Sequence, residues 1–233
     1  MSKLVVKFPT RNRPEKFKTV FTRYLTFLSG KHTVQFVISM DKDDSSMNCR
    51  SIKRWLNTRA KNALVSWNYG QSKSKIEACN ADLENVEGDV LLLASDDMVP
   101  IRQGYDQIIF DVFAEKFPNF DGAVRFWDGK RKRSDPLMTL PVIGLPLYRQ
   151  FGYVYHPAYR SVYCDNEQTE VFSNMAKLVI DPRCIIEHQW KPGAWDELHA
   201  RNESREVYKL DKKTFEERQS LGFPKEVGFD VSV

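Results

Sequence analysis

The chain lacks the features of a membrane-spanning or exported protein. No apolar run among its 233 residues approaches the ~18 residues that a membrane span needs, and residues 1–4 do not begin a hydrophobic signal segment. Its four cysteines lie far apart and form no C-x-x-C pair, so neither a zinc ribbon nor a disulfide framework is indicated. We therefore expect a soluble, cytoplasmic protein with reduced thiols.

Several common ligand-binding and nucleophile motifs are also missing. Neither G-x-x-x-x-G-K-[ST] nor G-x-G-x-x-G occurs, which disfavours a P-loop enzyme and a dinucleotide-binding Rossmann enzyme. There is no G-x-S-x-G nucleophile elbow. The net charge of +4, from 35 basic and 31 acidic residues, is too small to make sequence-blind nucleic-acid binding the default function.

The composition is that of a globular protein. Hydrophobic residues make up 42% of the chain and charged residues 28%, which excludes a disordered or collagen-like chain. The length is about one and a half times the ~150 residues typical of one domain. We expect either one large domain or a domain with an appendage.

The first half of the sequence alternates strands with amphipathic helices. Short loops between alternating strands and helices favour crossover connections and a mostly parallel sheet. The pattern predicts strands at 3–8, 33–40, 65–67, 89–94 and 122–127, and helices at 15–28, 51–64, 74–86 and 105–117. The predicted fold class is therefore α/β, a mostly parallel central sheet flanked by helices.

The pattern loosens after residue 127. Residues 128–160 favour loops and short strands, followed by a helix at 167–176 and two short strands at 178–180 and 184–186. A last helix is predicted at 211–221. We expect a main domain at 1–194 and a C-terminal helical extension at 195–233, packed on the outside or forming a mobile arm.

Two adjacent acids, Asp96 and Asp97, directly follow the most apolar predicted strand. Neighbouring carboxylates at the end of a buried strand repel each other and lose hydration unless a positive group, such as a divalent metal ion, lies there. The carboxyl ends of parallel strands are also where ligands bind in open α/β sheets. The alternative is that Asp96 only caps the turn before Pro100.

Further charged residues are expected along the same edge of the sheet. The acids could accept hydrogen bonds from a base or ribose, and the basic groups suit a diphosphate, although each is equally compatible with a solvated loop. These residues are Asp41, Asp43, Arg11, Arg13, Lys73 and Lys75.

With these residues in place, the sequence resembles the GT-A glycosyltransferases, in particular the compact family 2 type. The resemblance covers roughly the first 190 residues, and the spacing from Asn80 to the acid cluster matches that between the family's helical Asn and its D-x-D signature. It is carried by the segments at 8–14 (FPTRNRP), 38–41 (ISMD), 78–80 (ACN), 93–97 (LASDD) and 164–167 (CDNE).

The resemblance implies roles for individual residues. Thr10 and Arg11 would line the nucleotide pocket and Asp41 would contact the base, while Asp96 would face the ribose or donor sugar and Asp97 would bind the metal. Ser95 replaces the first acid of D-x-D, so which carboxylate touches the sugar stays open. Together with the charged residues above, the expected nucleotide-sugar site comprises Thr10, Arg11, Arg13, Asp41, Lys73, Lys75, Asn80, Ser95 and Asp96.

The C-terminal half should supply a catalytic base. Asp165 resembles the family's acidic motif on the acceptor side, with Glu167 as second choice; a helix N-cap is the alternative for both. His188 follows an apolar strand and could complete the metal site, or could be structural. Trp190 and Trp195 could stack on a sugar or base, or lie in the core.

The predicted function is a glycosyltransferase that uses Mn²⁺ or Mg²⁺. It would move a sugar, with inversion, from a nucleotide-diphosphate sugar, UDP being favoured, to the hydroxyl of an unidentified acceptor. The alternatives are a nucleotidyltransferase and a nucleic-acid-binding module that uses the basic cluster at 130–133 (KRKR) with Trp127. That cluster could also bind an anionic acceptor or be a solvated loop.

Overall fold

A computed structural model describes residues 1–60, 63–189 and 197–225 of the chain. The predicted domain boundary after residue 194, and with it Trp190 and Trp195, lies outside the described residues. None of the helices in the described part has the length and apolar character that crossing a membrane requires. All four cysteines are unpaired thiols.

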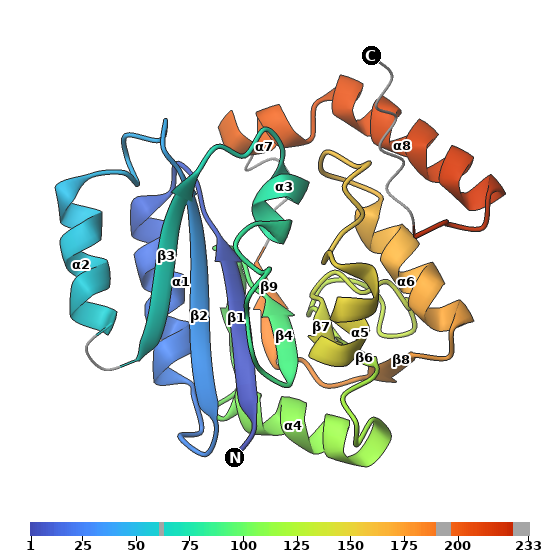
Figure 1. The fold of residues 1–233 in the computed structure, drawn as a ribbon, viewed down its shortest axis with the longest axis horizontal. Coiled ribbons are helices and arrows are strands. Elements are labelled where there is room, and N and C mark those ends of the chain that lie inside the picture. Colours follow the sequence, from blue (N-terminus) through green and yellow to red (C-terminus); the bar gives the residue numbers. More distant parts are fainter. Residues whose placement is uncertain (61–62, 190–196, 226–233) are drawn as a thin grey trace.

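The N-terminal half forms the parallel part of the sheet (Figure 1). β1 pairs in parallel with β2 on one side and with β4 on the other, and β2 pairs in parallel with β3. The elements are β1 (Lys3–Pro9), α1 (Pro14–Thr26), β2 (Thr33–Asp41), α2 (Arg50–Ala60), β3 (Leu64–Gly70), α3 (Lys75–Asn80) and β4 (Val90–Leu93).

The C-terminal half extends this sheet and adds a small second one. The seven-stranded sheet has the order β3-β2-β1-β4-β7-β6-β8, in which β7 is antiparallel to both neighbours, and β5 pairs antiparallel with β9. The remaining elements are β5 (Met98–Pro100), α4 (Tyr105–Lys116), β6 (Ala123–Phe126), β7 (Val142–Gly144), α5 (Leu145–Phe151), α6 (Cys164–Asn174), β8 (Leu178–Asp181), β9 (Ile186–His188), α7 (Glu197–Asn202) and α8 (Arg205–Ser220).

The strand order reverses between β1 and β4. The chain builds outward from β1 through β2 to β3 and then returns to place β4 on the other side of β1. Loops that leave two such strands diverge, and the crevice between them is where open α/β sheets bind ligands. The predicted α/β fold with a mostly parallel sheet is confirmed, and its topology places this crevice beside residues 10–13 and 95–97.

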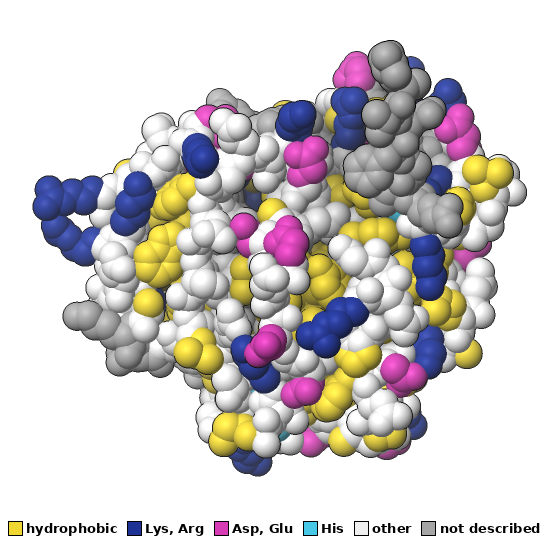
Figure 2. Space-filling view, viewed as in Figure 1, with side chains coloured by type: hydrophobic (Ala, Val, Ile, Leu, Met, Phe, Trp, Pro, Cys, Tyr) yellow, Lys and Arg dark blue, Asp and Glu magenta, His cyan; other side chains and the backbone are white. Residues whose placement is uncertain are grey.

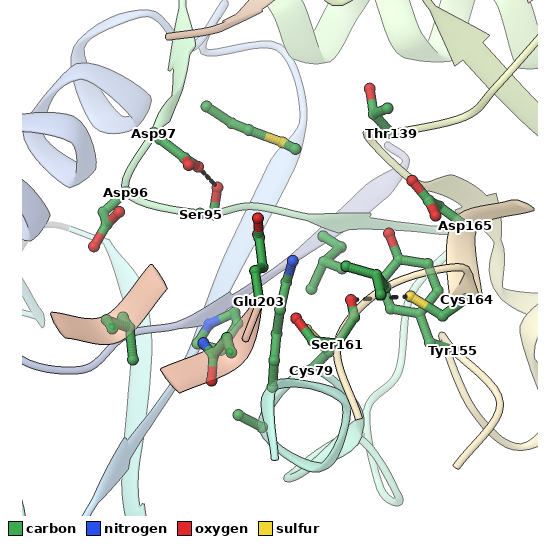
Figure 3. Close-up of a pocket in the computed structure, with 18 of the residues that line it drawn as sticks. Cys79, Ser95, Asp96, Asp97, Thr139, Tyr155, Ser161, Cys164, Asp165 and Glu203 are labelled. Atoms are coloured by element: carbon green, nitrogen blue, oxygen red, sulfur yellow. Dashed lines mark hydrogen bonds between the residues drawn. The ribbon is translucent and has the colours of Figure 1, made fainter. Parts of the chain in front are cut away.

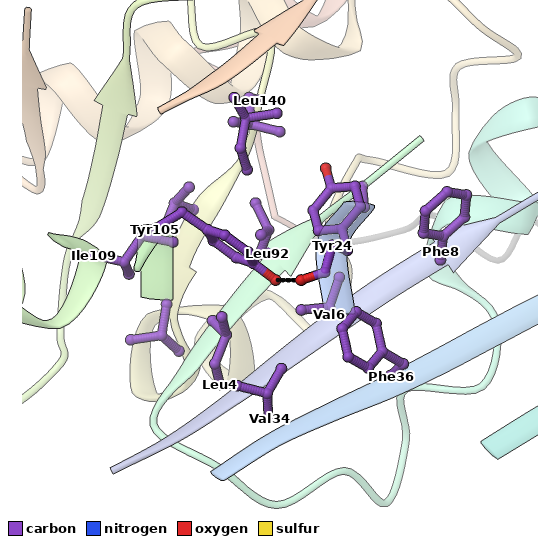
Figure 4. Packing of buried hydrophobic residues seen from close by; sticks show 14 of the residues in the cluster. Leu4, Val6, Phe8, Tyr24, Val34, Phe36, Leu92, Tyr105, Ile109 and Leu140 are labelled. Carbon is purple, nitrogen blue, oxygen red and sulfur yellow. Dashed lines mark hydrogen bonds between the residues drawn. The ribbon is translucent and has the colours of Figure 1, made fainter. Parts of the chain in front are cut away.

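The sheet separates two apolar layers because side chains alternate along each strand. Leu4, Val6 and Phe8 of β1 join the layer on the α1 side, whereas Val5 joins the opposite one. Figure 4 shows Phe8, Tyr24 and other members of the first layer packed together. β1 is thus fixed from both faces, and the loop at its end starts from a rigid support.

Two helices differ from the sequence prediction in the region of the site. α3 ends at Asn80 rather than at 86, because Asp82 adopts a positive φ of 61° that a helix cannot continue through. α5 occupies part of a segment predicted as loop. The sequence contains signals for both ends of this helix, a proline at its start and Gly152, with a φ of 76°, after its end. The helix could still not be predicted, because seven residues are too few for a clear period of apolar residues.

Two helix starts also differ. α6 begins at Cys164 rather than at 167, so Asp165 lies in its first turn and is not its N-cap. α8 begins at Arg205, where Ser204 accepts a hydrogen bond from the Val207 N–H. Asp211, expected to start this helix, lies in its middle and is fully buried.

Candidate active site

A cavity of about 820 Å³ opens at the carboxyl ends of β1, β2 and β4. This volume lies within the range of ligand-binding pockets. Most residues that the sequence predicts for the site line it, namely Thr10, Arg11, Arg13, Asp41, Lys75, Ser95, Asp96, Asp97, Asp165 and His188. Figure 3 shows Ser95, Asp96 and Asp97 at one side of this cavity and Tyr155, Cys164 and Asp165 at the other.

Asp96 is buried at the base of the cavity and is paired with basic groups. Its Oδ1 accepts a hydrogen bond of 2.9 Å from Arg13 Nη1 and lies 3.4 Å from Lys16 Nζ. Burial raises the pKa of Asp96, although the charges of Arg13 and Lys16 act to lower it. Asp96 is therefore held in place, at the end of β4, by basic residues at the start of α1.

The side chains of Asp97 and His188 lie next to each other in the lining of the cavity. The β5–β9 pairing places His188 opposite Met98, and the Gln189 N–H donates to the Asp97 carbonyl at 2.7 Å. His188 Nε2 lies 3.6 Å from Asp97 Oδ2, and Ser95 Oγ donates to the other carboxylate oxygen. Burial by itself would raise the pKa of Asp97, but His188 and the Ser95 hydroxyl hold it well below its usual range.

This pair fits a divalent ion whose other ligands come from a substrate. An ionised carboxylate is a ligand of both Mn²⁺ and Mg²⁺, whereas imidazole suits first-row transition metals rather than Mg²⁺, which is commonly held by one or two carboxylates together with substrate phosphates. Within residues 1–60, 63–189 and 197–225, no group of three or more His, Cys, Asp or Glu side chains could hold an ion on its own. Two protein donors would leave coordination positions that substrate oxygens could fill.

The loop after β1 contacts the end of β2. Arg11 Nη1 donates to Asp41 Oδ2 and to Asp43 Oδ1, each at 2.7 Å, and Nη2 donates to Asp43 Oδ2 at 2.9 Å. The second oxygen of Asp41 accepts the Ser72 N–H at 2.9 Å. In this arrangement Arg11 is paired with both acids, and its contact with a diphosphate stays a prediction.

Thr10 carries a buried hydroxyl with an unused hydrogen-bonding capacity. The residue is 8% exposed and lines the cavity, and its backbone N–H is bonded to the Ser39 carbonyl. Its Oγ1 has no partner among the described residues. A buried hydroxyl without a partner is costly, and a ligand in the cavity could supply one.

Asp165 lies on the opposite wall, in the first turn of α6. Burial raises the pKa of Asp165, against the lowering effect of the Lys75 charge. A carboxylate with a raised pKa in a cavity is a stronger base than an exposed one and is a candidate for proton transfer.

The described structure places three predicted site residues, Lys73, Asn80 and Glu167, outside the cavity lining. Lys73 is exposed on the approach to α3. The Asn80 side chain holds the 154–155 backbone through three hydrogen bonds of 2.7–3.0 Å.

Glu167 points away from the cavity, into a buried network. Its carboxylate binds Arg218 through two hydrogen bonds of 2.8 Å and accepts the Tyr159 hydroxyl at 2.7 Å. Of the two acids considered as base, the geometry therefore leaves Asp165 facing the cavity and Glu167 engaged elsewhere.

The cavity also contains residues that the sequence analysis missed. Asp128 follows β6 and accepts hydrogen bonds from the Lys130 and Arg131 N–H groups and from Thr139 Oγ1. The strand-end rule that identified Asp96 would have found it. Leu198, Asn202, Glu203 and Tyr208 come from α7, α8 and the turn between them, and no sequence signal connects them with the site.

Two residues of the basic cluster at 130–133 belong to the cavity rim. Lys130 and Arg131 line the cavity, Arg131 is bonded to Asp135 at 3.1 Å, and the Arg133 guanidinium lies 4.5 Å from the Trp127 ring centroid. The basic side chains that gather at the left of Figure 2 lie instead over α2.

Comparison with known proteins gives matches in structure but not in sequence. No protein-family model and no curated protein sequence matches the chain. A mannosyltransferase from Pyrobaculum calidifontis, PcManGT in complex with GDP-Man and Mn²⁺, is similar with a TM-score of 0.62 and 16% identity, over 82% of this chain and 58% of its own. S. aureus TarS 1–349 in complex with UDP is similar with a TM-score of 0.59 and 15% identity, over 99% of this chain and 75% of its own.

These similarities establish the fold. The chain has a GT-A-like glycosyltransferase fold, as the sequence motifs predicted. It spans less than two thirds of the length of the mannosyltransferase that it matches.

Proposed function

We propose that this protein is a glycosyltransferase that uses a nucleotide-diphosphate sugar as donor and Mn²⁺ or Mg²⁺ as cofactor. The observation that carries the proposal is the facing pair of Asp97 and His188, 3.6 Å apart, in the cavity at the reversal of strand order. Structures of the same fold in complexes with GDP-Man and Mn²⁺ and with UDP support it.

The nucleotide half of the donor is proposed to bind between the ends of β1, β2 and β4. Asp41 would accept a hydrogen bond from the base, with Arg11 fixing its orientation. The unpartnered Thr10 hydroxyl would bond to the nucleotide. Asp96 would accept hydrogen bonds from hydroxyl groups of the ribose or sugar. Because Arg13 neutralises its charge, it would not repel the diphosphate. A UDP-sugar is the donor to test first and GDP-mannose the second.

A divalent ion held by Asp97 and His188 would supply positive charge to the diphosphate, which stabilises a leaving nucleoside diphosphate. Asp165 would take the proton of the acceptor hydroxyl as its oxygen attacks the anomeric carbon. The bond from that carbon to the diphosphate oxygen breaks as the new one forms, and its electron pair leaves with the diphosphate. Attack from the face opposite the diphosphate gives inversion.

A thermal-shift panel tests this function. The protein is heated with UDP-glucose and GDP-mannose and with UDP, GDP, CDP and dTDP, each with Mn²⁺ and with a chelator. A ligand at 100 times its dissociation constant should stabilise the fold by about 2.7 kcal/mol. We expect at least one nucleotide to raise the melting temperature in Mn²⁺ more than in chelator. No shift with any of them at millimolar concentration would refute the proposal.

A further inference from the structure

Asp211 is an unusual residue of α8 because it is a fully buried acid in the middle of a helix. Its Oδ1 accepts the Arg160 N–H at 3.0 Å, and its Oδ2 accepts the N–H groups of Ser161 and Val162, each at 2.8 Å. A buried charge is costly unless hydrogen bonds compensate it, and here three consecutive backbone amides do so. The carboxylate thus fixes a backbone segment about 50 residues away in sequence.

That segment leads directly into the acceptor side of the cavity. Ser161, Val162 and Tyr163 line the cavity, and Asp165 follows in the first turn of α6. Tyr163 has a φ of 62°, a conformation that a tyrosine adopts only where its surroundings impose it. The hydrogen bonds to Asp211 are contacts that can impose it.

A second contact joins α8 to α6 further along. Arg218 binds Glu167 with both its Nε and its Nη2, and the same carboxylate accepts the Tyr159 hydroxyl. Residues 159–167 are therefore bonded to α8 near both ends of this stretch. Figure 1 shows α8 lying across the end of α6.

The same C-terminal helices contribute directly to the cavity. Leu198, Asn202, Glu203 and Tyr208 line it, and Figure 3 shows Glu203 between Ser95 and Ser161. The Tyr163 hydroxyl donates to the Tyr208 hydroxyl at 2.7 Å, so the two rings form one wall with polar groups at its rim. Aromatic faces next to amide and carboxylate groups suit an acceptor with many hydroxyl groups, such as a sugar.

We propose that α7 and α8 build the acceptor wall of the cavity and that Asp211 is a positioning residue, which fixes residues 160–162 and thereby the place of Asp165 at that wall. This inference rests on the function proposed above. It replaces the expectation of an outer helix or mobile arm with a segment that the site requires.

Three variants test it. Asp211→Ala removes the three hydrogen bonds that the carboxylate accepts from the backbone of residues 160–162. Asp211→Asn keeps the shape but turns an NH₂ group toward one of the three amides. Lys213→Ala changes an exposed residue of the same helix and serves as control. Each is measured by hydrogen exchange of the backbone amides and by hydrolysis of UDP-glucose and GDP-mannose, in which water takes the place of the acceptor.

We expect the amides of 160–162 to exchange at least about tenfold faster in Asp211→Ala, and β1–β4 to be unchanged. Misplacing a catalytic group by an ångström can cost about 10²-fold in rate. In Asp211→Asn, kcat for hydrolysis should therefore fall by roughly 10- to 100-fold while KM for the donor stays within twofold. Lys213→Ala should match the wild type in both measurements.

Two results would overturn the inference. One is unchanged exchange at 160–162 together with unchanged kcat in both Asp211 variants. The other is faster exchange throughout the sheet with loss of kcat and donor KM together in Asp211→Asn, which would make Asp211 a general stabiliser. Failure of the proposed function has a different signature: the wild type would neither bind nor hydrolyse either donor, whatever the exchange at 160–162.

Discussion

Replacing Glu167 by Gln separates a structural acid from a catalytic one. The sequence offered Glu167 as an alternative base, whereas the structure pairs it with Arg218 and Tyr159. In Glu167→Gln the side chain keeps its shape, but its NH₂ group faces one of the Arg218 donors, and the guanidinium loses its counter-charge in a buried place.

The size of the effect follows from burial. The Glu167 and Arg218 side chains are only 6% and 11% exposed, and two hydrogen bonds of 2.8 Å join them. Breaking a buried pair from one side costs about 3–5 kcal/mol. For a chain of this length each kcal/mol shifts the melting temperature by about 2–4 °C. We therefore expect Glu167→Gln to melt roughly 6–20 °C below the wild type.

Thermal unfolding and donor hydrolysis on the same preparations are the assays. Glu170→Gln is the matched control, since its carboxylate joins the same two helices through the uncharged Gln219 and should cost about 1 kcal/mol or less. The double variant Glu167→Met with Arg218→Met should recover stability except for about 1–3 kcal/mol, because apolar residues of similar volume often replace a buried pair without loss, while the buried Tyr159 hydroxyl loses its acceptor. If Glu167→Gln melted like the wild type and lost hydrolysis instead, the structural assignment would be refuted.

Three further outcomes are expected. Asp165→Asn should lower the rate of transfer or hydrolysis by about 10²–10⁴-fold with little change in donor affinity, measured by steady-state kinetics. Because burial raises the pKa of Asp165 and the base must be ionised, the rate should fall as pH drops through a value above the ordinary ~3.9, and a pH–rate profile checks this. Asn80→Ala removes three hydrogen bonds to residues 154–155 and should destabilise the fold by about 1–3 kcal/mol in denaturant titration.

Features set by local sequence could be predicted. The period of apolar residues gave the strands and the helices of the N-terminal half, since burial of one face or both leaves a regular pattern in the sequence. The acids Asp96 and Asp97 could be placed at a sheet edge because they directly follow a strand that is buried along its whole length. His188 could be proposed as a metal ligand only because it follows an apolar strand, since its approach to Asp97 depends on the pairing of β5 with β9.

Features set by contacts between residues far apart in the chain could not be predicted from the sequence. Glu167 and Arg218 are 51 residues apart, so nothing beside Glu167 in the sequence shows that its carboxylate is already engaged. The same holds for Asn80, whose partners at 154–155 lie in a segment predicted as loop. The sequence pattern predicts Asp211 as a helix start because Asp often occupies that position, whereas its carboxylate accepts hydrogen bonds from a distant backbone segment.

The most direct test of the central claim is a calorimetric titration of the preferred nucleotide-diphosphate sugar into wild type, Asp97→Asn and the exposed control Glu115→Gln, each in Mn²⁺ and in chelator. Donor affinity of the wild type and the control should be at least about tenfold higher in Mn²⁺, a difference of ~1.4 kcal/mol, and this gain should vanish in Asp97→Asn. Equal affinities in Mn²⁺ and chelator for the wild type, or an undiminished Mn²⁺ effect in Asp97→Asn, would contradict the account.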